Sequence, residues 1–165
     1  MEIKRVFDIL DLYKSSFVKN DVLSSKVNKS WKKYSNEDFI NYSNWVSYAL
    51  IKMGITQHDK VSIIANNRPE WNFCDYGSQQ ANVVTVPIFP TASKHDLQFI
   101  LNHSEAKLIF ISDKPIYEKL VSLEKELPHV QHIVSFEKID GLLSFDEFIN
   151  LGIEKDCFEE LHLIK

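Results

Sequence analysis

The clearest hydrophobic pattern in the chain is helical and lies between residues 36 and 53. Apolar side chains recur there every three or four residues and so share one helix face. They are Phe39, Tyr42, Val46, Ala49, Leu50 and Met53. Ser35 precedes the run and Asp38 follows three residues later, a weak form of the capping box with Asp in place of Glu or Gln. Gly54 comes next, where a helix end often needs a left-handed backbone.

Farther along, short continuous apolar runs alternate with further helical patterns. Such runs are typical of strands covered on both faces, and they span 61–65, 83–88, 107–112 and 132–136. Pro87 lies inside the second run, so we expect that strand to end there or to lie where no N–H is needed.

Helix-start signals separate these runs. Pro69 and Pro115 suit the first turn of a helix. Ser93 with Asp96, and Ser144 with Glu147, have the spacing of a capping box. The helix that Pro115 opens should turn Ile116, Leu120, Leu123 and Leu127 inward, and a last helix is expected around 145–151.

Strands that alternate with helices of this length predict a parallel sheet with right-handed crossovers and helices on both faces. The predicted fold class is therefore α/β, three-layered and mostly parallel, with flavodoxin-like βα repeats. We divide the chain into a helix with two short strands (1–34), a βα-repeat part (35–151) and an irregular tail (152–165). In the first part, 6–17 has helical spacing, and 22–34 predicts two strands with a turn near residues 28–30.

Composition is that of an ordinary globular protein, with 44% hydrophobic and 25% charged residues. A net charge of −4 gives no sign of a nucleic-acid partner or of binding to an anionic membrane, and we interpret Lys29, Lys32 and Lys33 as a solvated surface. The sequence contains no export signal and no apolar run of the roughly 18 residues that a membrane span needs. Cys74 and Cys157 fit no disulfide or zinc pattern, so we expect a cytoplasmic protein.

The strand-to-helix turns lack the usual chemistry of nucleotide sites. The segments 66–70, 89–93 and 113–114 contain no glycine, and neither GxGxxG nor GxxxxGK[ST] occurs. A bare helix N-terminus could hold an anion weakly. The first strand ends in Ala65-Asn66, without the paired acids of a phosphoacceptor receiver domain, and a GxSxG nucleophile elbow is absent.

Isolated polar residues allow two interpretations each. His129 and His132 have a chelating spacing, but no third ligand follows at a useful distance, so structural histidines are favoured. Arg68 could bind a carboxylate or phosphate, whereas local carbonyls or Glu70 are its more ordinary partners. We assign no catalytic, cofactor-binding or metal residue to this chain.

Several linked segments resemble the N-terminal part of AMP-forming acyl-CoA synthetases, and above all the long-chain fatty-acid branch. The similarity covers roughly 34–148. It rests on Gly54-Ile55, Asp59-Lys60-Val61-Ser62-Ile63-Ile64, Asn66-Asn67-Arg68-Pro69-Glu70-Trp71, Val84-Thr85-Val86-Pro87-Ile88-Phe89-Pro90-Thr91, 97–101 and Ser104-Glu105-Ala106-Lys107-Leu108-Ile109-Phe110. Asn82 stands where the family usually has glycine. Asn is the non-glycine residue that best tolerates a left-handed backbone conformation.

The resemblance implies a ligase that converts a fatty acid with ATP and Mg²⁺ to an acyl-adenylate, and then to acyl-CoA with coenzyme A. The family's phosphate loop, adenine motifs and catalytic lysine lie downstream of the matched stretch. The resemblance therefore implies an inactive N-terminal part of a larger fold, completed by the missing C-terminal part. It also implies a fatty acid substrate for the parent enzyme, for which a membrane surface is an alternative location.

The matched segments are mainly scaffold, and Asn67, Arg68, Phe89 and Thr91 are the candidates to border the ligand cleft. A stand-alone α/β binding or regulatory module without catalysis is the alternative function. An incomplete sheet should also leave open edges that favour self-association.

Overall fold

The helices and strands follow the alternation that the sequence predicts. We describe residues 3–16, 18–154 and 157–165 of a computed structural model. In chain order the elements are α1 (Asp8–Ser16), β1 (Leu23–Val27), β2 (Ser30–Tyr34), α2 (Asn36–Lys52), β3 (Lys60–Ile64), α3 (Pro69–Gln80), β4 (Val84–Ile88), α4 (Lys94–Ser104), β5 (Leu108–Ile111), α5 (Lys114–Val121), the 3-10 helix η1 (Glu124–Glu126), β6 (His132–Ser135), β7 (Leu143–Ser144), α6 (Phe145–Glu154) and α7 (Phe158–Ile164).

Five strands form a parallel sheet in the order β4-β3-β5-β6-β7. Counted from β3, this is the 2-1-3-4-5 order of flavodoxin-like sheets. The predicted α/β class with βα repeats is thus confirmed. The strand order could not be predicted from a single sequence. It places β3 where the direction of the crossovers reverses.

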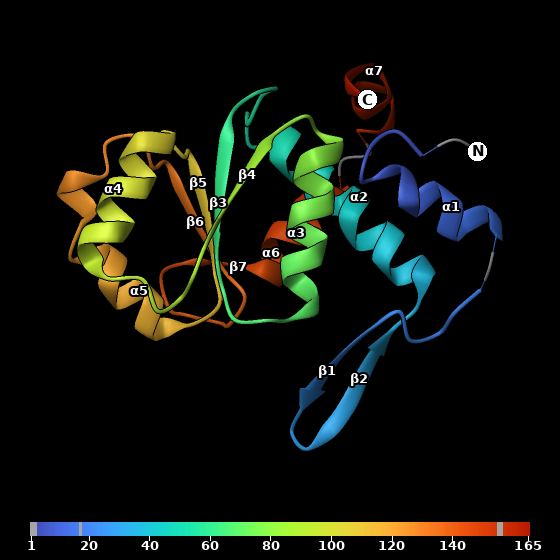
Figure 1. Cartoon of the computed structure of the whole chain (residues 1–165), viewed down its shortest axis with the longest axis horizontal. Helices are drawn as coiled ribbons and strands as arrows, with labels where there is room; N and C mark the ends of the chain where they lie inside the picture. The colour runs from blue at the N-terminus through green and yellow to red at the C-terminus, as the bar shows by residue number, and fades with distance from the viewer. Residues whose placement is uncertain (1–2, 17, 155–156) are drawn as a thin grey trace.

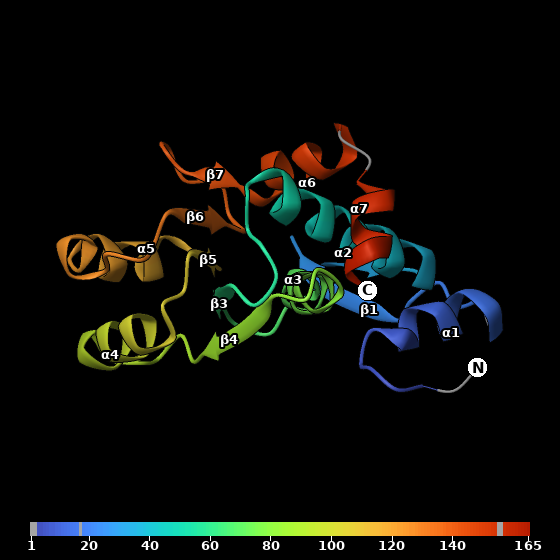
Figure 2. The same ribbon diagram turned by 90° about the horizontal axis from the view of Figure 1, so that it is seen from above.

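Helices cover the two faces of the sheet unequally. Figure 2 shows α4 and α5 on one side and α3, α2 and α6 on the other. The second side holds an aromatic core in which Phe73, Phe110 and Phe148 are fully buried, while the first is aliphatic and includes Ile109, Leu101 and other buried side chains. The predicted core residues Leu97 and Leu101 of α4 lie in the aliphatic core, whereas those of α2 lie in the aromatic core, where α2 packs mainly on α3 and α6.

Two glycines explain how closely α2 packs against its neighbours. A Cβ at Gly77 of α3 would lie 2.6 Å from the Ser43 carbonyl oxygen of α2. A Cβ at Gly152 of α6 would lie 2.1 Å from the Trp45 carbonyl oxygen. Since both distances are far below van der Waals contact, only glycine allows these helices to approach α2 so closely.

The predicted capping boxes are present. The Ser35 hydroxyl accepts from the Asp38 N–H at 3.1 Å, and the Asp38 carboxylate accepts from the Ser35 N–H at 2.8 Å. Ser93 with Asp96, and Ser144 with Glu147, form the same reciprocal pairs. Hydrogen bonds from the serines lower the pKa of Asp96 and of Glu147. These helix starts are therefore encoded locally.

The prediction that 83–88 is a strand buried on both faces is wrong, because β4 lies at the edge of the sheet and Val84 is 48% exposed. The backbone N–H of Val84 donates to the Asp59 carbonyl oxygen, on the β3 side. Because backbone N–H groups alternate in direction along a strand, the N–H position of Thr85 and that of Pro87 point away from the sheet. Pro87 thus lies where the sheet needs no N–H, and it removes one donor from the open edge. Self-association through edges stays a prediction.

Three other expectations need correction. Helix α5 ends at Val121, earlier than predicted, and Leu123 and Leu127 reach the core from the irregular segment around η1. Strand β7 was not anticipated from its two residues. The tail after residue 152 is not irregular throughout, since α7 forms there and buries Leu161. Phe17, the expected end of the first helix, lies outside the described residues. The three-part division of the chain stays a prediction.

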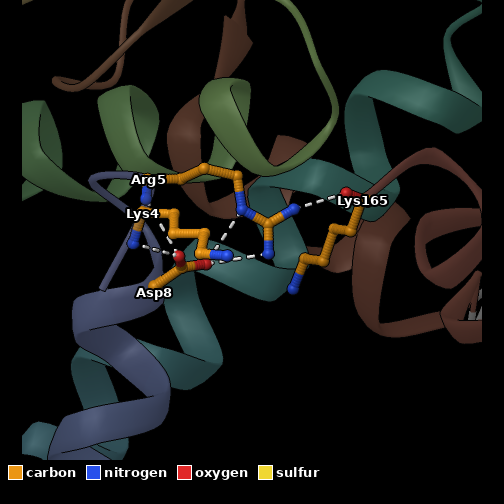
Figure 3. Close-up of polar contacts among 4 residues, drawn as sticks. All are labelled: Lys4, Arg5, Asp8 and Lys165. Atoms are coloured by element: carbon orange, nitrogen blue, oxygen red, sulfur yellow. Dashed lines mark hydrogen bonds and ion pairs between the residues drawn. The ribbon is translucent and has the colours of Figure 1, made fainter. Parts of the chain in front are cut away.

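The segment before α1 is tied to the end of α7 (Figure 3). The Asp8 carboxylate accepts from the backbone N–H groups of Lys4 and Arg5 at 3.0 and 2.9 Å and pairs with the Arg5 guanidinium at 2.8 Å. Arg5 also donates to the Lys165 carbonyl oxygen. The hydrogen bond from Arg5 helps to lower the pKa of Asp8, whereas burial lowers the pKa of Lys165. Segments from opposite ends of the sequence therefore lie together beside α2.

The predicted pair of short strands forms an antiparallel hairpin, β1–β2, that projects from the body of the molecule (Figure 1). Its turn residues Asn28 and Lys29 have φ of 49° and 67°. A two-residue turn with two positive φ angles matches the right-handed twist of the strands that it joins.

Candidate functional site

The carboxyl ends of the parallel strands form the candidate site. In open α/β sheets, ligands bind outside these ends, at the point where the strand order reverses. Here that point lies between β3 and β5, and the segments at it are 65–68 and 112–113. We call these segments, together with 89–93 after β4 and 136–137 after β6, the carboxyl-end surface.

Arg68 occupies the position between β3 and β5. Its Nε and Nη2 atoms donate to the Glu70 carboxylate at 2.9 and 3.1 Å. Its Nη1 atom donates weakly to the Ser112 carbonyl oxygen at 3.5 Å, and its guanidinium lies 5.1 Å from the centre of the Phe136 ring. Arg68 thereby joins the ends of β3, β5 and β6.

Burial and the charge of Glu70 shift the pKa of Arg68 in opposite directions. Desolvation lowers the pKa of its guanidinium, but the hydrogen bonds and charge of Glu70 outweigh it, so the pKa is raised overall. The side chains of Arg68 and Glu70 are only 24% and 17% exposed. The pairing with Glu70, one of the two interpretations of Arg68, is confirmed, and an incoming anion would have to compete with this carboxylate.

A groove of 420 Å³ lies beside Arg68. Its lining residues come from β1 and from the start of α3, and they are Leu23, Ser24, Asn67, Arg68, Pro69, Trp71 and Asn72. Two of the four predicted cleft-bordering residues, Asn67 and Arg68, therefore share one concave surface. Asn67 is exposed and Trp71 is half-buried, so the groove offers an amide, a guanidinium and an aromatic ring.

The other two candidates, Phe89 and Thr91, lie in the turn after β4. The Phe89 carbonyl accepts from the Ala92 N–H at 3.0 Å, and Lys119 of α5 donates to the carbonyl oxygens of Pro90 and Ala92 at 3.1 and 3.3 Å. Phe89 is nevertheless 82% exposed. Neither Phe89 nor Thr91 lines the groove beside Arg68, so the structure gives the four candidates two separate locations at the same end of the sheet.

Side chains cap the N-termini of α4 and α5 at this end, whereas α3 has no side-chain cap. Helix α3 begins with Pro69, which has no N–H, and the Ser93–Asp96 box caps α4. The Asp113 carboxylate accepts from the Ile116 N–H at 3.2 Å and so occupies the start of α5. An anion at the start of α4 or α5 would therefore compete with these caps, whereas α3 has no side-chain cap and weak anion binding there stays a prediction.

In the described ranges we find neither a cluster of metal ligands nor a glycine-containing phosphate turn at the carboxyl-end surface. Within 3–16, 18–154 and 157–165, no group of three or more His, Cys, Asp or Glu side chains is arranged to hold a metal. The turns of the carboxyl-end surface contain no glycine that would let a backbone approach phosphate. We therefore assign no step of nucleotide chemistry to the described residues.

Sequence reasoning missed Ser112 and Phe136 as partners of Arg68. Both lie at the ends of predicted strands, so a place at the carboxyl ends was foreseeable. Their contact with Arg68 depends on β5 and β6 following β3 in the sheet, which the pattern of a single sequence does not determine.

The geometry and the ordered segments agree with one family model, that of the AMP-binding enzymes, which matches residues 17–150. The chain belongs to the AMP-binding enzyme family. Long-chain-fatty-acid–CoA ligase ACSBG2 of Xenopus laevis is 27% identical over 135 residues, which are 79% of this chain and 18% of that protein. Fatty acyl-CoA synthetase A of Dictyostelium discoideum is 27% identical over 97 residues, 59% of this chain and 14% of that protein.

Solved structures of low sequence identity share the fold. The anthranilate CoA ligase AuaEII in complex with anthranoyl-AMP matches with a TM-score of 0.75 and 20% identity, over 89% of this chain and 27% of that one. The N-terminal domain of FACL13 from Mycobacterium tuberculosis matches with a TM-score of 0.69 and 17% identity, over 92% and 36%. The five-stranded sheet and its helices thus correspond to the N-terminal part of the fold of adenylate-forming enzymes.

The chain spans about a fifth of the length of the long-chain fatty-acid ligases that it matches. None of the helices in the described ranges combines the length and hydrophobicity that crossing a bilayer requires.

Proposed function

We propose that this chain is the N-terminal part of an ATP-dependent, AMP-forming ligase whose substrate is a fatty acid. In that reaction a carboxylate oxygen attacks the α-phosphorus of ATP and pyrophosphate leaves. Coenzyme A thiolate then attacks the acyl carbonyl and AMP leaves. The observation that carries the proposal is the family match over 17–150, together with relatives named for fatty acids and fatty acyl groups.

In this proposal the described residues act as scaffold and not as catalysts. Arg68 keeps the ends of three strands together, and Asn67, Arg68, Phe89 and Thr91 border the cleft. The segments that grip ATP and Mg²⁺ and bind coenzyme A belong to other parts of the ligase. The 165-residue chain alone is then inactive, and it needs the rest of the ligase as its partner.

ATP–pyrophosphate exchange tests this proposal. We would assay the product of the reading frame that contains this chain with fatty acids of graded length and with aromatic carboxylates, and assay the 165-residue chain beside it. We expect exchange that depends on fatty acid for the former and none for the short chain. The fatty-acid assignment would be contradicted if only aromatic acids supported exchange, or if none of the acids did. Exchange by the short chain would contradict its role as scaffold.

One feature favours the alternative of a non-catalytic binding module. Helices α1 and α7 lie beside α2, and their residues Leu10 and Leu161 are buried against the same core, so the chain encloses that core by itself. If the native product of the reading frame lacks exchange activity with every acid, this alternative replaces the ligase.

We also propose a cytoplasmic location. Both cysteines, Cys74 and Cys157, are buried; the Cys74 thiol is free, and burial raises its pKa well above the usual value. Unpaired cysteines are typical of a reducing compartment. Cell fractionation with antibody detection tests the location, and recovery from an oxidising compartment would contradict it.

A further inference from the structure

The β1–β2 hairpin carries an exposed aromatic side chain surrounded by lysines. Residues 23–34, which form the hairpin, contain four lysines and no acidic residue, whereas the whole chain has a net charge of −4. Positive charge is therefore concentrated on a projecting hairpin, and the remainder of the chain is acidic. Such a separation of charge orients a protein toward an anionic surface.

Strand register divides these side chains between the two faces of the hairpin. Directly opposed residues of an antiparallel pair share a face, and Lys26 lies opposite Trp31. Lys33, two residues after Trp31 on the same strand, lies on that face as well. Trp31 is 66% exposed, and Lys26 and Lys33 are exposed too. We call this the tryptophan face.

The opposite face of the hairpin contacts the body at its base, whereas Val27 near the turn is 48% exposed. This face contains Tyr34, which is 4% exposed and packs its ring 5.3 Å from that of Phe73. The Lys32 ammonium lies 4.8 Å from the centre of the Tyr34 ring. Because Tyr34 anchors the base of the hairpin, the tryptophan face forms without a partner.

We propose that the tryptophan face docks on the surface of an anionic lipid bilayer. An indole has an apolar body and a polar N–H, which suit the headgroup level of a membrane. Lysine stems extend along apolar surface while their ammonium groups reach the phosphates. Lysines near an anionic surface each strengthen binding about fivefold, and they act within a Debye length.

The shape of the hairpin favours a membrane over the other anionic partners. Two strands of five residues offer much less than the roughly 800 Å² per partner of a stable protein interface. A single exposed tryptophan without a surrounding groove also differs from the several stacked aromatics along a channel that bind single-stranded nucleic acid. The ion pair between Lys33 and Asp21 is 3.4 Å long and exposed, so it gives way easily to lipid phosphate.

The location of the hairpin gives this docking a consequence. Leu23 and Ser24 of β1 line the groove beside Arg68, so the hairpin lies next to the carboxyl-end surface (Figure 1). Membrane contact would bring that groove close to the lipid. If the ligase proposal holds, this is where a fatty acid leaves the membrane, but docking itself does not depend on catalysis.

Vesicle flotation without ATP or fatty acid tests the proposal. We would compare phosphatidylcholine vesicles with vesicles that also contain phosphatidylserine, at low and high salt. The full 165-residue chain should float with the anionic vesicles at low salt and be released by high salt. Equal binding to both kinds of vesicle, or to neither, would overturn the proposal.

Matched variants locate the contact. Lys26→Gln with Lys33→Gln should weaken partition about 25-fold, at about fivefold per lysine. Trp31→Ala should weaken it on the order of tenfold through lost apolar burial. The control for Trp31→Ala is Phe99→Ala on α4. The control for the two lysine changes is Lys125→Gln in η1 with Lys138→Gln in the β6–β7 connection. Thermal unfolding would verify that every variant is folded.

Two results would assign the hairpin to something else. If the controls weaken partition as much as the hairpin variants do, the tryptophan face is not the contact and the proposal fails. If single-stranded RNA retains the chain at a salt concentration that releases it from anionic vesicles, the lysines serve nucleic acid, and the membrane proposal is overturned.

Discussion

The two ends of the parallel strands differ in the contacts that connect them and in the side chains that they expose. At the amino end, the Asp59 carboxylate pairs with Lys107 at 2.7 Å and accepts from the Thr56 N–H at 2.8 Å. The His58 N–H donates to the Asn82 carbonyl at 2.8 Å. These contacts connect the residues that lead into β3, β4 and β5.

At the carboxyl end, Arg68 connects the ends of β3, β5 and β6. Several side chains around it are largely exposed to solvent. Phe89 is 82% exposed, and Asn67 and Thr91 are exposed as well. Exposed loop residues held by a rigid scaffold are the usual position for binding groups. We propose from this comparison that the amino end mainly stabilises the fold, whereas the carboxyl end, apart from Arg68, presents groups to a ligand.

Among the substitutions that compare the two ends, Arg68→Ala should lower the free energy of unfolding most. It leaves the Glu70 carboxylate partly buried without its partner, and we expect a loss of about 2 kcal/mol, between the values for exposed and buried pairs. Arg68→Lys keeps the charge but not the two parallel hydrogen bonds, so it should lose about half as much. Urea unfolding measures both, and a loss below about 0.5 kcal/mol for Arg68→Ala would show that the tie is not structural.

Asp59→Asn tests the amino end and should cost about 1 kcal/mol at neutral pH. Burial tends to raise the pKa of Asp59, but hydrogen bonds from Lys107 and Thr56 outweigh it, so the pKa is lowered overall. The stabilisation is therefore complete above the unfolded-state pKa of about 4 and is lost as pH falls through the lower folded-state value. Unfolding at several pH values should show the difference between wild type and Asp59→Asn shrinking in acid.

An exposed aspartate provides the control for that pH series. Asp140 is exposed in the connection between β6 and β7. Asp140→Asn should change stability by less than about 0.5 kcal/mol at neutral pH. If the difference between wild type and Asp59→Asn stayed constant down to strongly acidic pH, the ionised carboxylate would not be the source of the stabilisation.

Glu105→Gly should stabilise the amino end by about 0.5–1 kcal/mol. Glu105 follows α4 with φ of 56° and ψ of 38°. This is a left-handed conformation that a Cβ disfavours. Its ion pair with Lys60 is 4.0 Å long and exposed, so little is lost with the side chain. Glu105→Ala keeps the Cβ and should show no gain in urea unfolding, and equal stabilities of the two variants would contradict this explanation.

Phe89→Ala should have the smallest effect on stability, within about 0.5 kcal/mol of wild type. The reason is that the ring lies largely in solvent. Thermal unfolding measures the change. A larger loss would mean that the turn 89–93 contributes to folding as Arg68 does, which would weaken the contrast between the two ends.

Local sequence signals predicted most of the fold correctly. Ser35 with Asp38 and Ser93 with Asp96 act over a single helical turn, so the starts of α2 and α4 follow from the chain alone. The edge position of β4 was missed because burial of a strand depends on its neighbours in the sheet. Helix α7 was missed because its buried face relies on α2, which lies far earlier in the chain.

The candidate site was predicted only in part, for a similar reason. Asn67 and Arg68 are adjacent in sequence and share a groove, as expected for one loop. The contact of Arg68 with Phe136 joins loops that follow different strands, so it depends on the strand order. Sequence reasoning therefore found the loops but not the side chains that Arg68 brings together.

The most direct test of the contrast between the two ends uses ATP–pyrophosphate exchange by the product of the reading frame that contains this chain. Phe89→Ala and Asn67→Ala at the carboxyl end would be compared with Gln57→Ala, an exposed residue at the amino end. We predict that kcat/KM for fatty acid falls about tenfold for the carboxyl-end variants, as for altered contacts of a binding pocket, and stays unchanged for Gln57→Ala. Equal effects at the two ends, with all variants folded, would contradict the assignment of function to the carboxyl end.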